Sequence, residues 1–282
     1  MNGLNHNALT RSAVPIPPCE RSLQTVEAQP YFSVSEASLV LEGAVFDRNN
    51  NLLFVDAATG RVFKLTPERQ LSIVLKENTF GASGLAVHKD GRIFIASVGD
   101  MQRGSVRAIE PDGTREQMIV DPEGGFLAND LVFDNQGGFY FTDSRGNSAD
   151  PQGGVFYVSP NVGSIHAILP GLAVGNGLAI DPDGTLIWAT EHAKNRLHRV
   201  RLSDATTIAP FGSVVTYQFT GPAPDGARVD SEGNVYVAIS GQGRIMVFNR
   251  NGQISFNIIY IMRTNVSGGK ICISAVMIDL VH

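Results

Sequence analysis

Short apolar runs separated by turn-forming residues recur along most of the chain. Thirty glycines stand at short intervals, and few long stretches show the spacing of an amphipathic helix. The runs are nearly continuously apolar, as expected for strands that are covered on both faces. The pattern therefore predicts an all-β protein built from many short, buried strands.

Five segments repeat one unit, which consists of an apolar strand, an Asp-rich turn and a second apolar strand. The units begin at Gly43, Gly84, Asp130, Gly177 and Gly226, and these starting points are 41, 46, 47 and 49 residues apart. Each unit continues into a third strand, such as RVFKLTP or GRIMVFNR, and usually into a weaker fourth. Four antiparallel strands in about 40–50 residues are typical of one β-propeller blade.

The five units occupy residues 43 to about 255, and the flanking segments leave room for one more blade. Residues 33–42 would supply its outer strand, and the tail from Asn257 would supply the rest, although this tail is short and lacks the Asp-Gly turn. We expect a six-bladed β-propeller of four-stranded antiparallel blades over residues 21–282, with a sixth blade that the C-terminal tail fills poorly. Residues 1–20 are expected to form a disordered or loosely packed leader, because their prolines oppose regular structure.

The residue immediately before the first strand of each unit carries an oxygen-bearing side chain. The innermost strand of a propeller blade lines the central channel, so its first residue lies at one mouth of that channel. Turn formation does not explain the position, because Glu is a poor turn residue and the turn lies elsewhere. We expect a convergent polar ring, formed by Glu42, Ser83, Asn129, Asn176 and Asp225.

The chemistry of this ring indicates a hard divalent cation. Two carboxylates and two amide carbonyls suit Ca²⁺ first and Mg²⁺ or Mn²⁺ next, whereas the absence of His and Cys from the ring makes Zn²⁺ less suitable. Without a cation, Glu42 and Asp225 would repel each other in a narrow channel.

Several other polar residues have structural interpretations. The Asp residues of the repeated turns cap those turns with their own side chains, and His88 takes the same place in the second unit. His166, His192 and His198 are expected to be structural, and Trp188 is expected in the core. The residues at the ends of the second strands either orient the ring or cap the strand ends; these are Asp56, Ser97, Asp143, Glu191 and Ser240.

Composition excludes several classes of partner. The chain has 22 basic and 27 acidic residues, a net charge of −5, and no Lys/Arg cluster, which argues against nucleic acid and anionic membranes. Cys19 and Cys272 have no metal-binding spacing and are expected to be free thiols. The N-terminal segment lacks the apolar core of a secretory signal, so we expect a cytoplasmic protein with a small-molecule partner; its oligomeric state stays open.

The motifs LEGAVFD, NDLVFDNQGGFYFTDSRG, GGVFYVSP, VGNGLAID, NRLHRV, PDGARVD and NVYVAISGQGRIMVFN resemble those of the gluconolactonase and senescence marker protein family. They span residues 40 to about 258. The resemblance implies a six-bladed propeller that hydrolyses lactone rings with a calcium ion at the channel mouth. It also implies that Glu42, Asn129, Asn176 and Asp225 hold the ion, and that Asp225 acts as the acid or base.

Two departures from the family pattern lie beside the implied ion. In one branch of the family, Asp stands in the place of Asn129 and Ser in the place of Gly226, so this chain has a weaker ligand at the first position and none at the second. A second, structural calcium site of that branch uses an Asp that matches Asp121.

Two other functions are compatible with the same ring. A metal-dependent hydrolase of organophosphate esters would use the same ligands on a phosphoryl group. A non-catalytic binding propeller would have a polar ring without metal affinity and aromatic or Arg anchors on a rim.

Overall fold

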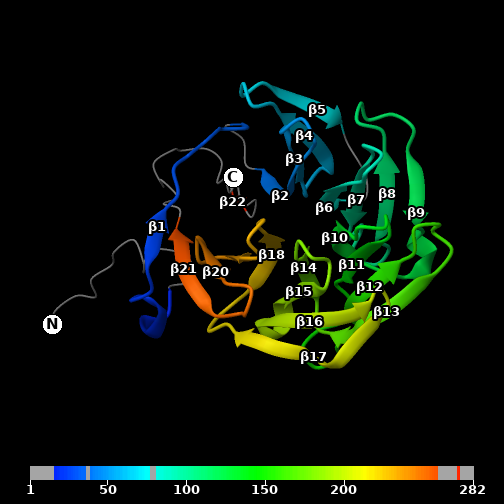
Figure 1. Ribbon diagram of the computed structural model, residues 1–282. Coiled ribbons are helices and arrows are strands. Elements are labelled where there is room, and N and C mark those ends of the chain that lie inside the picture. Colours follow the sequence, from blue (N-terminus) through cyan, green and yellow to red (C-terminus); the bar gives the residue numbers. More distant parts are fainter. Residues whose placement is uncertain (1–15, 36–38, 77–80, 260–271, 274–282) are drawn as a thin grey trace.

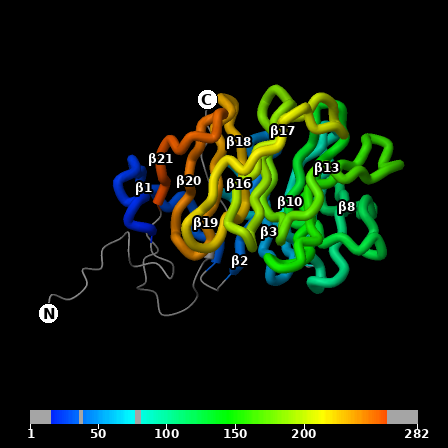
Figure 2. The backbone as a smooth tube through the Cα atoms, turned by 90° about the horizontal axis from the view of Figure 1, so that it is seen from below, coloured from blue at the N-terminus to red at the C-terminus, as the bar shows by residue number. Residues whose placement is uncertain are grey.

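In the computed structural model, residues 16–35, 39–76, 81–259 and 272–273 are described. Each of the five repeats forms one antiparallel sheet, or blade, in which the four strands follow one another in chain order. Figure 1 shows the blades arranged around a common centre, with the first strand of each blade innermost. The strands of these blades stand side by side in Figure 2. The all-β propeller architecture predicted from the sequence is therefore confirmed.

The strand bounds follow the repeats read from the sequence. Blade 1 has β2 (Val40–Phe46), β3 (Leu52–Asp56), β4 (Arg61–Leu65) and β5 (Leu71–Leu75). Blade 2 has β6 (Ala82–Val87), β7 (Ile93–Ser97), β8 (Ser105–Ile109) and β9 (Gln117–Val120). Blade 3 has β10 (Ala128–Phe133), β11 (Phe139–Asp143), β12 (Gly153–Val158) and β13 (Ile165–Leu172). Blade 4 has β14 (Gly175–Ile180), β15 (Leu186–Glu191), β16 (Arg196–Asp204) and β17 (Thr207–Gln218), and blade 5 has β18 (Pro224–Val229), β19 (Val235–Ile239), β20 (Arg244–Phe248) and β21 (Ile254–Ile259).

Short elements complete the described chain. Three 3₁₀ turns cover Pro18–Glu20, Pro122–Gly124 and His192–Lys194. The strand β1 (Thr25–Glu27) adds to the outer edge of blade 5, where it pairs in parallel with β21. The two-residue strand β22 (Cys272–Ile273) pairs in parallel with β2. No helix among the residues that the structure describes is long and apolar enough to cross a membrane.

Hydrophobic side chains fill the spaces between successive blades. One buried cluster lies between each pair of neighbours from blade 1 to blade 5, and Trp188 is fully buried in the cluster between blades 4 and 5. The remaining faces of blades 1 and 5 carry separate clusters, and no cluster of described residues joins these two blades. The blades therefore form an arc with five members and one interruption (Figure 1).

Where the structure describes the segments that were expected to form a sixth blade, these segments pair with other blades. Val40, Leu41 and Glu42 belong to β2, the innermost strand of blade 1, so these three residues are not part of an outer strand. Most of the tail after Ile259 lies outside the described residues. Glu20, which the sequence assigned to the leader, is 5% exposed and forms an ion pair with Arg244 of blade 5.

The repeated turns have the structure that their Asp residues predict. Asp47, for example, accepts hydrogen bonds from the backbone N–H groups of Asn49 and Asn51 at 2.8 and 2.9 Å. The same pattern recurs at Asp134 and Asp230, and Asp181 accepts from the N–H groups of Thr185 and Leu186. These side chains fix the hairpins at the ends of the inner strands.

Candidate functional site

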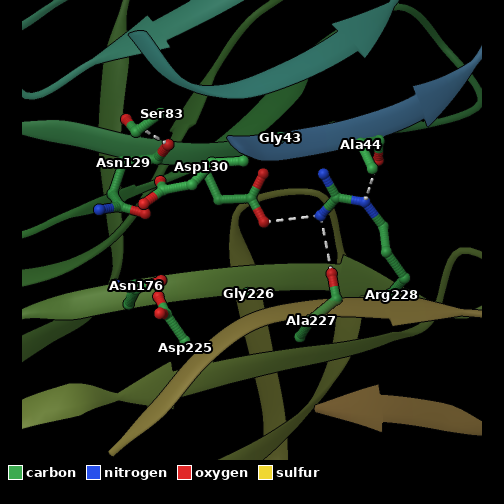
Figure 3. Close-up of a pocket in the computed structure, with 11 residues that line it drawn as sticks. Gly43, Ala44, Ser83, Asn129, Asp130, Asn176, Asp225, Gly226, Ala227 and Arg228 are labelled. Atoms are coloured by element: carbon green, nitrogen blue, oxygen red, sulfur yellow. Dashed lines mark hydrogen bonds and ion pairs between the residues drawn. The ribbon is translucent and has the colours of Figure 1, made fainter. Parts of the chain in front are cut away.

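The five residues of the polar ring lie on the innermost strands, and each stands at an irregularity of its strand. The pairing of the first and second strands shifts at or next to the ring residue in all five blades. Such a bulge turns side chains away from the regular alternation of a strand. Glu42, Ser83, Asn129, Asn176 and Asp225 all line one depression of about 440 Å³, including its open mouth (Figure 3).

Glycine follows the ring residue in most blades because the next blade comes very close. A Cβ atom on Gly84 would lie 2.6 Å from the carbonyl oxygen of Asn129, and one on Gly177 would lie 2.3 Å from that of Asp225. At Gly43 the corresponding distance, to the carbonyl oxygen of Ser83, is 2.9 Å. These contacts leave no room for a side chain. Gly226 of blade 5 differs, because a Cβ there would have no atom of the described residues within 4 Å.

Hydroxyl groups hold the ring residues from the preceding blade. Ser83 Oγ donates to the carbonyl oxygen of Asn129 at 2.9 Å, and Thr190 Oγ1 donates to that of Asp225 at 2.9 Å. Thr142 Oγ1 donates in the same way to Asn176. The two threonines were not predicted as part of the site. Their signal in the sequence is a Thr directly before the acidic residue that ends the second strand.

The residues at the ends of the second strands do not orient the ring side chains. Asp56, Asp143 and Glu191 accept hydrogen bonds from backbone N–H groups that lead into the inner strand of the same blade, at 3.0, 3.0 and 2.9 Å. Ser97 donates to a backbone carbonyl at the corresponding place in blade 2, at 2.7 Å. Of the two interpretations left open by the sequence, strand-end capping is the one that these bonds support.

The carboxyl groups of the ring are destabilised in their charged forms. The pKa of Glu42 is raised to about 8. Burial is the largest cause, and the negative charges of Asp225 and Asp130 add to it. Burial also raises the pKa of Asp225, while the positive charge of His192 and a hydrogen bond from Asn176 oppose this effect without overcoming it. Two carboxylates therefore share a depression that favours either protonation or a nearby cation.

Two charged residues of the depression were missed by the sequence. Asp130 directly follows Asn129, and its Oδ2 forms an ion pair with Arg228 Nη1 at 2.7 Å (Figure 3). The two oxygens of Asp130 also accept the backbone N–H groups of Leu131 and Leu178, at 2.9 and 3.0 Å. Asp130 is thus already neutralised, which leaves Glu42 and Asp225 as the carboxylates open to a ligand.

The other candidate residues lie apart from the ring or at its edge. Asp121 is exposed and caps the turn at Pro122 by accepting the N–H of Glu123 at 2.8 Å. His198 pairs with Glu191 at 3.0 Å, as a structural residue would. His192 lies close enough to influence the charge of Asp225, and its Nδ1 is 3.2 Å from the carbonyl oxygen of Pro224, so this histidine belongs to the edge of the site.

The donor set is compatible with a hard cation. Its open side-chain ligands are all oxygens, from the carboxylates of Glu42 and Asp225 and the amides of Asn129 and Asn176. Within the described ranges, no three His, Cys, Asp or Glu side chains gather into a metal-binding group, so the two amides are essential to a site of four ligands.

The fold and the site define a β-propeller whose inner strands direct oxygen ligands into one mouth of the central channel. The chain belongs to the SMP-30/gluconolactonase/LRE-like family, whose sequence pattern matches residues 40–267. It is 41% identical over 254 residues to lactonase drp35 of Staphylococcus haemolyticus, which covers 88% of this chain and 78% of the relative. Lactonase drp35 of Staphylococcus saprophyticus is 43% identical over 246 residues, with 86% and 76% covered.

Solved structures share the fold at lower identity. A gluconolactonase from Xanthomonas campestris has a TM-score of 0.66 at 21% identity, covering 79% of this chain and 77% of the other. Regucalcin from Agrobacterium tumefaciens, a calcium-binding protein, has a TM-score of 0.68 at 21% identity, covering 84% and 80%. These structures show the same fold, and the family pattern together with the lactonase relatives confirms the predicted family.

Proposed function

We propose that this chain is a calcium-dependent lactonase whose ion is held at the channel mouth by Glu42, Asn129, Asn176 and Asp225. The observation that carries the proposal is the convergence of these four oxygen-bearing side chains in one depression. The relatives named as lactonases support the reaction class, and the calcium-binding neighbour supports the choice of ion. Mg²⁺ and Mn²⁺ are compatible with the same ligands.

The chain's own groups supply proton transfer and orientation. A bound divalent cation would polarise the lactone carbonyl as a Lewis acid. Asp225 is proposed to accept a proton from the attacking water, whose oxygen bonds to the carbonyl carbon, and to return that proton to the alkoxide oxygen when the ring C–O bond breaks. The product is a hydroxy acid.

Asn176 and Thr190 are proposed to keep Asp225 in place. Asn176 donates to the Asp225 carboxylate, and Thr190 fixes its backbone carbonyl at 2.9 Å. The side chain is therefore held from two directions, which reduces the freedom that it would lose in the reaction.

We also propose that the arc has the curvature of a six-bladed propeller. The space beside Gly226 is where a sixth inner strand would approach, since the glycines at this position in blades 1, 2 and 4 are all covered by the next blade. The separate apolar clusters on the outer faces of blades 1 and 5 agree with this arrangement.

Calcium titration by calorimetry tests the proposed site, with Glu42→Gln and Asp225→Asn as variants. Wild type is expected to bind one ion, and each variant is expected to bind at least about tenfold more weakly, because a charged ligand becomes neutral. Glu232→Gln, in the exposed turn of blade 5, is the matched control and should behave like wild type. A folded wild type that binds no calcium would contradict the proposal.

Turnover of aromatic and sugar lactones then tests the reaction. Asp225→Asn should lose at least about a hundredfold in kcat at saturating calcium, since it can no longer transfer a proton. Retention of the wild-type kcat would remove Asp225 from this role. Hydrolysis of a phosphotriester but of no lactone would favour the organophosphate alternative, and calcium binding without any turnover would favour a binding protein.

A further inference from the structure

Arg228 connects three blades beside the ring. Its Nη1 donates to Asp130 Oδ2 of blade 3 and to the carbonyl oxygen of Ala227, both at 2.7 Å. Its Nε donates to the carbonyl oxygen of Ala44 in blade 1 at 3.1 Å. Figure 3 shows the guanidinium extended between these groups, within the depression that the ring residues line. One side chain of blade 5 therefore reaches across the channel to two other inner strands.

The strand of Arg228 itself, β18, and the strand of Ala44, β2, carry the two ring carboxylates. Ala44 is two residues after Glu42 on β2, and Arg228 is three residues after Asp225 on β18. These strands belong to blades 1 and 5, which lie on the two sides of the interruption in the arc. The bond from Arg228 to Ala44 therefore acts directly on the relative position of Glu42 and Asp225.

At three of the ring positions, a hydroxyl group of the preceding blade fixes the ring residue. Hydroxyl groups from blades 2, 3 and 4 hold Asn129, Asn176 and Asp225. No hydroxyl group of blade 5, as far as the structure describes it, donates to β2. Among the described residues, the hydrogen bond from a blade 5 side chain to β2 comes from Arg228.

We propose that Arg228 is a positioning residue that sets the spacing between Glu42 and Asp225 for a shared cation. Arg228 holds the neighbouring inner strand by a hydrogen bond to a backbone carbonyl, as hydroxyl groups of a preceding blade do elsewhere in the ring. Asp130 fixes the guanidinium and neutralises most of its charge, so that the arginine can stand near a cation site. The inference rests on the proposed calcium site.

The charge of Arg228 and its positioning bond predict opposite effects of its removal on calcium affinity. A binding measurement therefore distinguishes the two roles. Loss of a positive charge beside the ring would strengthen calcium binding if charge dominated. Loss of the positioning bond would weaken it. Arg228→Gln removes the charge and the three-way contact, whereas Arg228→Lys keeps the charge but replaces the planar fork with a single ammonium group.

Calcium titrations of the two variants are the test, with Arg250→Gln as the control. Arg250 pairs with Asp183 on the exposed surface at 3.0 Å, so its removal changes the net charge equally without touching the channel. Both Arg228 variants should bind calcium about tenfold more weakly or worse, and Arg250→Gln should match wild type. Unchanged or tighter binding by Arg228→Gln overturns the proposal, as does wild-type affinity in Arg228→Lys.

Hydrogen exchange on the metal-free protein provides a second readout that does not need calcium. Arg228→Gln should exchange faster than wild type in β2 and β18, and equally in β14, whose ring residue is held by Thr142. Equal exchange in β2 and β18 overturns the positioning role. If wild type binds no calcium, the proposed function fails, and the exchange data still decide whether Arg228 fixes these two strands.

Discussion

At the scale of single residues, the ring positions have the same place in the backbone of each blade but carry different side chains. The five positions carry Glu, Ser, Asn, Asn and Asp on strands that are distorted at the same place. The resemblance to the lactonase family places an Asp where this chain has Asn129. Ser83 holds Asn129 through its backbone carbonyl, and this bond does not depend on the side chain that is replaced.

Asn129→Asp is therefore expected to tighten calcium binding. A third carboxylate adds charge to the ligand set, and affinity should rise about tenfold or more. Asn49→Asp, which adds the same charge at the exposed turn of blade 1, is the control for the change in net charge. Calorimetric titration measures both. An unchanged dissociation constant in Asn129→Asp would exclude this residue as a ligand.

At the scale of the strand, close approach between blades determines where glycine is needed. Gly177 and Gly226 follow ring residues in blades 4 and 5 and occupy the same place in the repeat. The next blade covers Gly177, whereas no described residue lies against Gly226. Identical residues in identical repeat positions are thus under different constraints from the described part of the chain.

This difference predicts opposite outcomes for the same substitution. Gly177→Ala should lower the free energy of unfolding by about 2 kcal/mol, since its Cβ would overlap the carbonyl oxygen of Asp225. Gly226→Ala should stay within about 0.5 kcal/mol of wild type, because nothing opposes its Cβ. Urea unfolding of the two variants gives the comparison. Equal losses would mean that the two glycines are alike in solution.

The repeats explain which parts of the strands and site were predictable. Features that recur in each unit, such as the first three strands, the turn aspartates and the ring, could be read by aligning the units with one another. Asp130 and Arg228 occur once each, and their ion pair joins residues 98 positions apart in the chain. The pairing of Glu20 with Arg244 spans 224 positions. Such contacts depend on how blades are placed in space, which periodicity does not report.

At the scale of the whole molecule, the blades are stabilised in a chain of neighbours. Four apolar clusters join blades 1 to 5 in sequence, and the end faces are covered separately. The N-terminal segment contributes at blades 4 and 5, where Glu20 accepts a hydrogen bond from Tyr217 of blade 4 at 2.7 Å and pairs with Arg244 of blade 5. Global unfolding must break all of these contacts, so it reports on groups buried in any blade.

Mild acid is expected to remove a contribution of His198 in blade 4 to this global stability, while the raised pKa of Glu42 acts in the opposite direction. Burial lowers the pKa of His198, and the hydrogen bond and charge of Glu191 oppose this without outweighing it. The unfolded residue has a pKa of 6.5, so below that pH the unfolded chain binds a proton that the folded protein does not. This contribution to stability is complete above pH 6.5 and is lost as the pH falls towards the folded pKa.

Urea unfolding from about pH 7.5 to about pH 5.5 measures the effect, which for one proton is at most about 1.4 kcal/mol per pH unit. His198→Gln keeps a donor for Glu191 but cannot titrate, so the wild type should lose stability relative to this variant as the pH falls. The contribution of Glu42 is common to both proteins and cancels in the comparison. Parallel pH profiles for wild type and variant would show that His198 does not contribute.

The strand distortion that recurs at the ring has a consequence for how such proteins change their chemistry. Because each blade places one residue at the same point by means of its main chain, that residue can be exchanged without redesigning its surroundings. Each of the five ring side chains can therefore be substituted independently of the other four, by evolution or by an engineer. New metal preferences and new substrates are then reached by single codon changes.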